Sequence, residues 1–234
     1  MKGFWIMQKS ADTAYTGEVA SRYEQDRHTE PLWETEQEYI RQLLAGWPVG
    51  GTLLDVPIGT GRFLPLYFER GISVWGLDIS EDMLAAARER YKEGCKVELI
   101  IGSAQKLNLP SKSVDHAICW RFAHLVNSEI LSTILGELAR VVKREFVVQF
   151  YSLQPGRRRD VGVGFQIKQA VLLFFSRVAS KLPWAKPWAN IRIYTHFEGD
   201  IEDRLRLLGV KIKRVDTIPD RTYNVCVYVI ACDS

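Results

Sequence analysis

The sequence lacks paired cysteines and long hydrophobic runs, and each absence narrows the class of protein. Its four cysteines form no C-x-x-C pair and match neither a zinc site nor a compact disulfide framework. We therefore expect no metal site and reduced, mostly buried thiols, which suits a cytoplasmic protein. The longest clearly apolar helical run, residues 170–175, is far short of the ~20 residues that a spanning helix needs. Residues 1–10 contain no apolar stretch long enough for a signal peptide.

The sequence also has little net charge. A formal charge of +3 over 234 residues gives no general reason to expect a nucleic-acid partner, whose binding requires many phosphates to be neutralised. The hydrophobic share of 47% and the charged share of 25% are those of an ordinary globular protein. We expect residues 1–234 to form a single domain. Composition does not predict the oligomeric state.

Strand and helix patterns alternate along the first two thirds of the chain. Apolar runs at 52–56, 72–77, 97–101, 114–120 and 146–151 read as strands, and one-faced helical patterns occur at 63–68, 80–92 and 130–142. A helix at 199–208 and two strands at 210–218 and 223–231 follow, and strands this close pair antiparallel. The pattern predicts an α/β fold: a doubly wound, mostly parallel seven-stranded sheet with a C-terminal antiparallel hairpin and helices on both faces.

A glycine turn follows the first strand. Residues 57–61 read P-I-G-T-G, and Gly59 and Gly61 let the backbone come closer to a ligand than a Cβ would allow. Asp78 ends the second strand, 17 residues after Gly61, where an acid can accept both hydroxyls of a ribose. Together these features indicate an adenosine-containing ligand.

Two classes of cofactor compete for this turn. A nicotinamide or flavin enzyme would have a third glycine at the position of Leu64. Asp55, directly before the turn, is poorly placed for a pyrophosphate. An acid there instead suits the positively charged amino group of a methionine moiety, so the dinucleotide interpretation is disfavoured.

Four segments, in order, resemble the class I S-adenosylmethionine-dependent methyltransferases. They are D-V-P-I-G-T-G at 55–61, L-D-I-S-E-D-M-L at 77–84, G-S-A-Q-K-L-N-L-P at 102–110 and V-D-H-A-I-C at 114–119. The resemblance is good over residues 53–151 and looser at the C-terminal strand pair. It departs from the usual family pattern at Pro57, where a glycine is common, and at Ser103, where an acid is common.

The resemblance implies a set of cofactor contacts for S-adenosylmethionine. The turn would line the methionine and ribose, Asp78 would hold the ribose, and the carbonyl of Trp120 would accept from the methionine amino group. The full predicted set is Asp55, Pro57, Gly59, Thr60, Gly61, Asp78, Ile79, Met83, Ser103, Ala104 and Trp120, with Ile79 and Met83 on the adenine faces and Ser103 and Ala104 at its edge.

Candidates for the acceptor side follow the fourth strand or lie outside the core. His124 and His196 are candidates for proton removal, and Tyr15, Tyr23, Arg121 and Tyr194 for contact with the acceptor. A general base helps only when the acceptor is a hydroxyl or a protonated amine, so a catalytic residue is not obligatory. We expect residues 1–48 to form a helical lid, 49–152 the cofactor-binding core, 153–196 an insertion over the acceptor site, and 197–234 the last helix and strand pair.

The acceptor itself is predicted only as a class. No [DN]-P-P-[FYW] tetrapeptide and no Pro-Cys pair is present, which further disfavours nucleic acid. We expect methylation of an oxygen or nitrogen of a small, partly apolar metabolite. The amphipathic stretch 165–182, followed by Trp184 and Trp188, leaves open a lipid, quinone or lipid-linked acceptor at a membrane surface. A catalytically silent, cofactor-binding regulatory domain is the third possibility.

Overall fold

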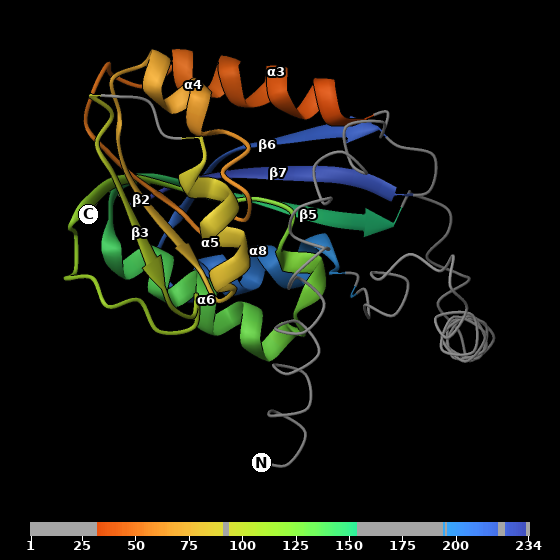
Figure 1. Cartoon of the computed structure of the whole chain (residues 1–234). Coiled ribbons are helices and arrows are strands. Elements are labelled where there is room, and N and C mark those ends of the chain that lie inside the picture. Colours follow the sequence, from red (N-terminus) through yellow and green to blue (C-terminus); the bar gives the residue numbers. More distant parts are fainter. Residues whose placement is uncertain (1–31, 91–93, 154–193, 195, 220–222, 233–234) are drawn as a thin grey trace, which may run out of the picture.

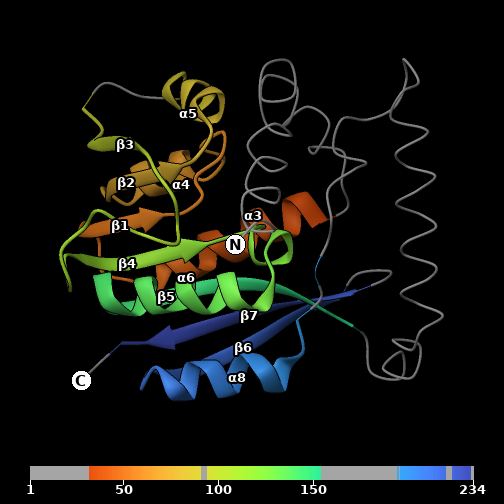
Figure 2. The ribbon, with the colours of Figure 1, turned by 90° about the horizontal axis from the view of Figure 1, so that it is seen from below.

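The computed structural model describes residues 32–90, 94–153, 194, 196–219 and 223–232. Seven strands form one sheet in the order β3-β2-β1-β4-β5-β7-β6. Figure 2 shows this order across the sheet, from β3 at one edge to β6 at the other. They are β1 (Thr52–Asp55), β2 (Ser73–Asp78), β3 (Val97–Ile101), β4 (Val114–Cys119), β5 (Val142–Leu153), β6 (Lys211–Pro219) and β7 (Tyr223–Ala231). The first five run parallel, and β7 pairs antiparallel with both β5 and β6. The predicted fold class is confirmed.

Helices cover both faces of the sheet (Figure 1). They are α3 (Leu32–Ala45), α4 (Leu64–Glu69), α5 (Glu81–Arg88), α6 (Ser128–Val141) and α8 (Glu198–Leu207), with a 3-10 turn η1 at Ala123–Leu125. Buried residues of α3, α4 and α5 share one apolar core, and those of α6 and α8 share the other. The hydrophobic residues of a doubly wound sheet thus point to both faces, as parallel strands buried on both sides require.

The position of β1 creates the site. β1 lies between β2 and β4. After β1 the chain adds β2 and β3 toward one edge of the sheet, and it then crosses back to place β4 on the other side of β1. Both residues at its centre, Leu53 and Leu54, are buried. In an open α/β sheet, the point where the strand order reverses leaves a crevice beyond the carboxyl ends of the strands. The ends of β1, β2 and β4 therefore border one cleft.

The strand β5 is longer than its apolar run predicts. It begins directly after α6, at Val142, although residues 143–145 are charged. Glu145 pairs with Ala231 of β7 and accepts a hydrogen bond from the indole of Trp47 at 3.2 Å. Partners far away in the sequence therefore stabilise strand residues that local patterning assigns to a loop.

Three further expectations concern the cysteines, membrane-spanning helices and metal sites. None of the four cysteines is in a disulfide, and Cys119, Cys226 and Cys232 are buried. Over the described ranges, no helix is long and apolar enough to cross a membrane. Within the same ranges, no group of three or more potential metal-ligating side chains occurs. The segments 1–31 and 154–193, which hold most of the predicted lid and insertion, lie outside the described residues.

Candidate cofactor and acceptor site

A cleft opens at the carboxyl ends of β1, β2 and β4, with about 920 Å³ of empty space that includes open solvent. Its walls combine the glycine turn, the end of β2, the start of α5, the loop after β4 and the first turn of α3. The lining residues are Trp33, Asp55, Pro57, Ile58, Gly59, Thr60, Arg62, Phe63, Asp78, Ile79, Ser80, Met83, Trp120, Arg121, Phe122 and Leu125. The cleft is mostly apolar, with charged groups at a few defined points.

The turn depends on two glycines in the left-handed backbone region. Gly59 has a φ of +56° and lines the cleft, whereas Gly61 has a φ of +70°. A Cβ at Gly61 would lie 2.6 Å from Cδ1 of Leu64, so this glycine allows the turn to pack on α4 and does not itself line the cleft. A Cβ at Gly59 would meet no atom within 4 Å, which leaves the backbone there open to a ligand.

Asp78 ties the turn to the end of β2. Its side chain is buried, and its Oδ2 accepts from the backbone N–H of Gly59 at 2.9 Å, while Oδ1 accepts from that of Ser80 at 2.9 Å. Burial raises the pKa of Asp78, and these backbone hydrogen bonds counteract the rise. Each carboxylate oxygen has a second lone pair, so the group can still accept two hydroxyls of a ribose.

Asp55 is the second acid of the cleft. It is 3% exposed, and its Oδ2 accepts from the hydroxyl of Tyr67 at 2.9 Å. Burial raises the pKa of Asp55 to about 7, the hydrogen bond from Tyr67 lowers it, and the nearby charge of Asp78 raises it further. An ammonium group placed beside this carboxyl would favour its ionised form.

The structure brings most of the predicted cofactor residues together. Eight of them line the cleft: Asp55, Pro57, Gly59, Thr60, Asp78, Ile79, Met83 and Trp120. Ser103 and Ala104 do not line it, and Ser103 Oγ instead accepts from the backbone N–H of Gln105 at 3.3 Å. An acid for a diol, apolar Ile79 and Met83 beside it, and a second acid for an amine are the groups that an adenosyl amino acid requires. The residues present therefore fit S-adenosylmethionine.

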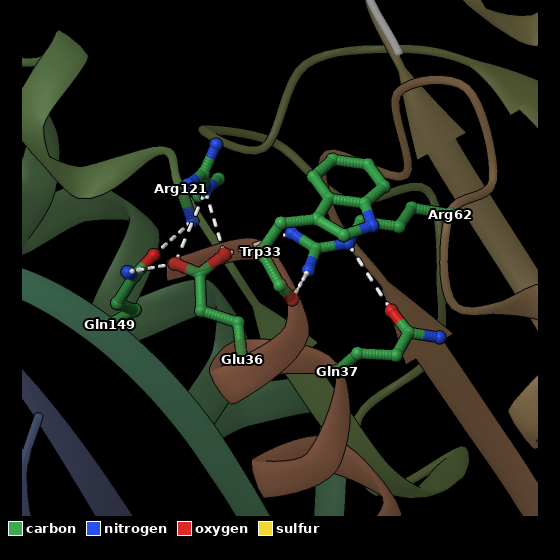
Figure 3. Close-up of polar contacts among 6 residues, drawn as sticks. All are labelled: Trp33, Glu36, Gln37, Arg62, Arg121 and Gln149. Carbon is green, nitrogen blue, oxygen red and sulfur yellow. Dashed lines mark hydrogen bonds and ion pairs between the residues drawn. The ribbon is translucent and has the colours of Figure 1, made fainter. Parts of the chain in front are cut away.

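A charged network around Glu36 of α3 borders the cleft (Figure 3). Glu36 is fully buried. Its carboxylate accepts from Nε of Arg121 at 3.0 and 3.2 Å, from Nη1 of Arg62 at 2.8 Å and from Nε2 of Gln149 at 3.0 Å. Gln149 Oε1 accepts in turn from the backbone N–H of Arg121 at 2.7 Å. Of this network, sequence reasoning found only Arg121.

Arg62 binds the first turn of α3 to the glycine turn. Its guanidinium lies 3.5 Å from the centre of the Trp33 ring and donates to the carbonyl of Trp33 and to Gln37 Oε1 (Figure 3). A cation over an indole face is a favourable contact. The only sequence signal for Arg62 was its place directly after Gly61. Its partners lie more than twenty residues away, where no local pattern points to them.

The predicted histidines and Tyr194 lie near the cleft but do not line it. His124 is buried, with its ring edge-to-face to Tyr151 at 4.7 Å. His196 donates through Nε2 to the carbonyl of Ala123 at 2.8 Å, and burial lowers its pKa. The backbone N–H of Tyr194 donates to the carbonyl of His124 at 2.7 Å. These contacts fix residues 194 and 196 against η1. Tyr15 and Tyr23 lie outside the described residues.

Comparison with known proteins identifies the domain. Residues 53–145 match the family described as "Methyltransferase domain". The chain is 32% identical over 158 residues to a malonyl-[acyl-carrier protein] O-methyltransferase of Pectobacterium atrosepticum, covering 68% of this chain and 59% of that protein. It is 36% identical over 98 residues to a phosphatidylethanolamine N-methyltransferase of Cereibacter sphaeroides, covering 41% of this chain and 47% of that protein. The chain thus spans about half the length of the curated relatives that it matches.

The fold is shared over a greater length than the sequence. The magnesium protoporphyrin IX methyltransferase of Synechocystis PCC 6803, solved with bound SAH, superimposes with a TM-score of 0.72. The alignment covers 97% of this chain and all of that one, at 18% identity. Residues 53–145 thus form a methyltransferase domain, and the chain shares its fold with a solved methyltransferase that binds SAH.

Proposed function

We propose that the protein transfers a methyl group from S-adenosylmethionine to an oxygen or nitrogen of a small, partly apolar acceptor in the cytoplasm. The observation that carries this proposal is that Asp55 and Asp78 line the same cleft as the apolar side chains of Phe122 and Leu125. The cofactor supplies an electrophilic methyl group when bound. The free cysteines support the cytoplasmic location.

The residues of the cleft bind and orient. Asp78 accepts the ribose hydroxyls, Ile79 and Met83 pack against the adenine, and Asp55 attracts the methionine ammonium. Methyl transfer requires the acceptor atom at ~3–3.5 Å from the methyl carbon and in line with the leaving sulfur. The wall formed by Trp120, Phe122 and Leu125 excludes water and restricts the acceptor to such a position.

Proton removal by His124 or His196 stays a separate hypothesis. The described geometry gives His196 a structural contact with Ala123, and neither histidine lines the cleft. Turnover of the His124→Ala and His196→Ala variants over a range of pH checks this role. If both variants keep full turnover at every pH, neither histidine acts as the base. Tyr15, Tyr23, Arg121 and Tyr194 remain the proposed acceptor contacts.

Calorimetric titration with S-adenosylhomocysteine tests the proposed cofactor site. We expect the wild-type protein to bind it and the Asp78→Asn variant to bind it roughly 10–100-fold more weakly, because hydrogen bonds to a charged group contribute ~1.5–3 kcal/mol. The matched control is Asp203→Asn, since Asp203 is an exposed residue of α8. Absence of binding by the wild-type protein, or equal binding by the Asp78→Asn variant, contradicts the proposal.

A lipid acceptor at a membrane surface is the second candidate. It is favoured by the 36% identity to a phosphatidylethanolamine N-methyltransferase and by the amphipathic stretch 165–182, which lies outside the described residues. Co-sedimentation with anionic phosphatidylglycerol vesicles at low salt distinguishes the two candidates, because only an interfacial enzyme is expected to pellet with them. Turnover with any acceptor would contradict the third candidate, a catalytically silent regulatory domain.

A further inference from the structure

Arg121 is held in an uncommon backbone conformation at the edge of the cleft. Its φ is +53°, and Lys112 is the other non-glycine residue with positive φ in the described part of the chain. A left-handed backbone is unfavourable for an L residue with a long side chain, and it persists where the surroundings over-determine it, often at functional sites. Here Gln149 holds the backbone N–H and Glu36 holds Nε.

This arrangement fixes the direction of the guanidinium. The side chain of Arg121 is 10% exposed and that of Glu36 is fully buried. The carboxylate of Glu36 is itself held by Arg62 and by the amide of Gln149. A long, rotamer-rich side chain is therefore ordered before any ligand arrives, which favours affinity because less freedom is lost on binding.

The neighbouring residue contributes a second donor. Trp120 is 5% exposed and lines the same cleft. Its indole N–H is buried, and among the described residues it has no hydrogen-bond partner. An indole nitrogen can only donate, and a buried donor without an acceptor is unfavourable. A ligand oxygen would supply the acceptor that the described protein atoms do not.

The strand order places these donors on the acceptor side. Asp78 ends β2, the glycine turn follows β1, and Trp120 and Arg121 follow β4, on the other side of β1 from β2. With the ribose at β2 and the methionine moiety at β1, the end of β4 faces the region where an acceptor approaches. Phe122 and Leu125, from the same loop, line the cleft beside them.

We propose that the acceptor carries a carboxylate, which binds the guanidinium of Arg121 and the indole N–H of Trp120, while its apolar part contacts Phe122 and Leu125. This inference rests on the proposed function and names its substrate class. The planar guanidinium matches the geometry of a carboxylate better than any other side chain does. Glu36 and Gln149 are positioning residues that orient Arg121 and do not touch the acceptor.

Calorimetry on the protein saturated with S-adenosylhomocysteine tests the proposal. The probes are octanoate and 4-phenylbutyrate, each compared with its neutral amide. We expect both carboxylates to bind at least about tenfold more tightly than their amides, as a charge-assisted pair predicts. The Arg121→Gln variant should lose this preference, and the Arg206→Gln variant should keep it, because Arg206 is an exposed residue of α8. No preference in the wild type, or a preference that survives Arg121→Gln, overturns the proposal.

Two further variants test the second donor and the positioning residues. Trp120→Phe keeps an aromatic ring and removes the N–H, and Gln149→Leu removes the acceptor for the backbone of Arg121. In both, the carboxylate-over-amide ratio should fall about threefold or more. In Gln149→Leu, whose side chain does not line the cleft, affinity for S-adenosylhomocysteine should stay within twofold. A purely structural role would not change that ratio selectively. An unchanged ratio in both variants contradicts the assigned contacts.

The carboxylate of the cofactor is the competing source of the same chemistry. Binding of S-adenosylhomocysteine is therefore compared with binding of 5′-methylthioadenosine, which lacks the amino-acid carboxylate. If Arg121→Gln weakens the first tenfold or more and leaves the second unchanged, Arg121 binds the cofactor and the acceptor proposal is overturned, while the proposed function stands. If the wild type binds neither, the proposed function fails first.

Discussion

At the scale of single residues, we expect Asp55 to couple cofactor binding to pH. Burial raises its pKa to about 7, so the carboxyl is mostly neutral at pH 6 and mostly ionised at pH 8. In the proposed site, the ammonium of the methionine moiety would bind the ionised form. We expect the affinity for S-adenosylhomocysteine to be roughly tenfold weaker at pH 6 than at pH 8. Calorimetry at the two pH values measures the ratio. In the Asp55→Asn variant the affinity for S-adenosylhomocysteine should be lower and independent of pH. If the variant has the same pH dependence as the wild type, another group causes the effect.

The same residue has the opposite effect on the free protein. The pKa of Asp55 is about 7 in the folded state, above the usual value of 3.8. Between pH 3.8 and pH 7 the folded state therefore binds more protons than the unfolded state. The free energy of unfolding falls as pH rises through this range. From pH 5 to pH 8, wild type should lose on the order of 2–3 kcal/mol relative to Asp55→Asn. Urea unfolding of both proteins at each pH measures this difference. A constant difference would show that the carboxyl is already ionised at pH 5.

Residue-level prediction identified residues that line the cleft where the signal is local. Asp55, Gly59 and Asp78 follow directly from a strand, a turn and a strand end, and all three line the cleft. The contact between Glu36 and Arg121 joins residues 85 positions apart, and a glutamate in an amphipathic helix normally predicts a solvated face. No periodicity distinguishes this buried glutamate from its exposed neighbours, so the network required the tertiary structure.

At the scale of elements, the glycine turn tests how tightly β1 is joined to α4. In the Gly61→Ala variant a Cβ would lie 2.6 Å from Leu64, a fully buried residue, and the φ of +70° adds strain. Backbone strain should lower the free energy of unfolding by ~1–2 kcal/mol, and overpacking should lower it by a further ~1–3 kcal/mol. Gly71→Ala is the matched control, because its φ is +63° and nothing lies within 4 Å, so only the strain applies. Urea unfolding compares the two, and equal losses would exclude a packing role for Gly61.

The helix α3 offers a second comparison within one element. Glu36→Ala removes the buried carboxylate that Arg62 and Arg121 share, and breaking a buried ion pair costs ~3–5 kcal/mol. Glu38→Ala removes an exposed carboxylate that pairs with Arg41, where solvent screening leaves little to lose. Unfolding of both variants by denaturant measures the difference. Similar stability of the two variants would mean that α3 is held by its apolar face alone.

At the scale of the whole molecule, alternation of strands and helices was sufficient to predict the fold. Crossover connections between parallel strands are right-handed, and consecutive elements usually lie next to each other. The order of the elements along the chain therefore leaves few possible topologies, and the observed sheet has one of them. Strand ends were less predictable. Residues 143–145 are charged, yet they belong to β5, because Val142 pairs with Val114 of β4 and Glu145 pairs with Ala231 of β7. Hydrophobic patterning identifies which elements form, while long-range pairing decides where they end.

Because the proposed cofactor contacts come from β1, β2, α5 and the loop after β4, binding should stabilise the molecule as a unit. A ligand at about 100 times its Kd stabilises the folded state by ~2.7 kcal/mol, which for a chain of 234 residues corresponds to a rise in melting temperature of about 5–10 °C. Thermal unfolding with S-adenosylhomocysteine measures this rise. NAD is the control, because Leu64 stands where a dinucleotide site has its third glycine and the buried Asp55 lies before the turn. An equal shift with NAD would mean that the cleft recognises adenosine alone and that neither Asp55 nor the end of β4 selects the methionine moiety.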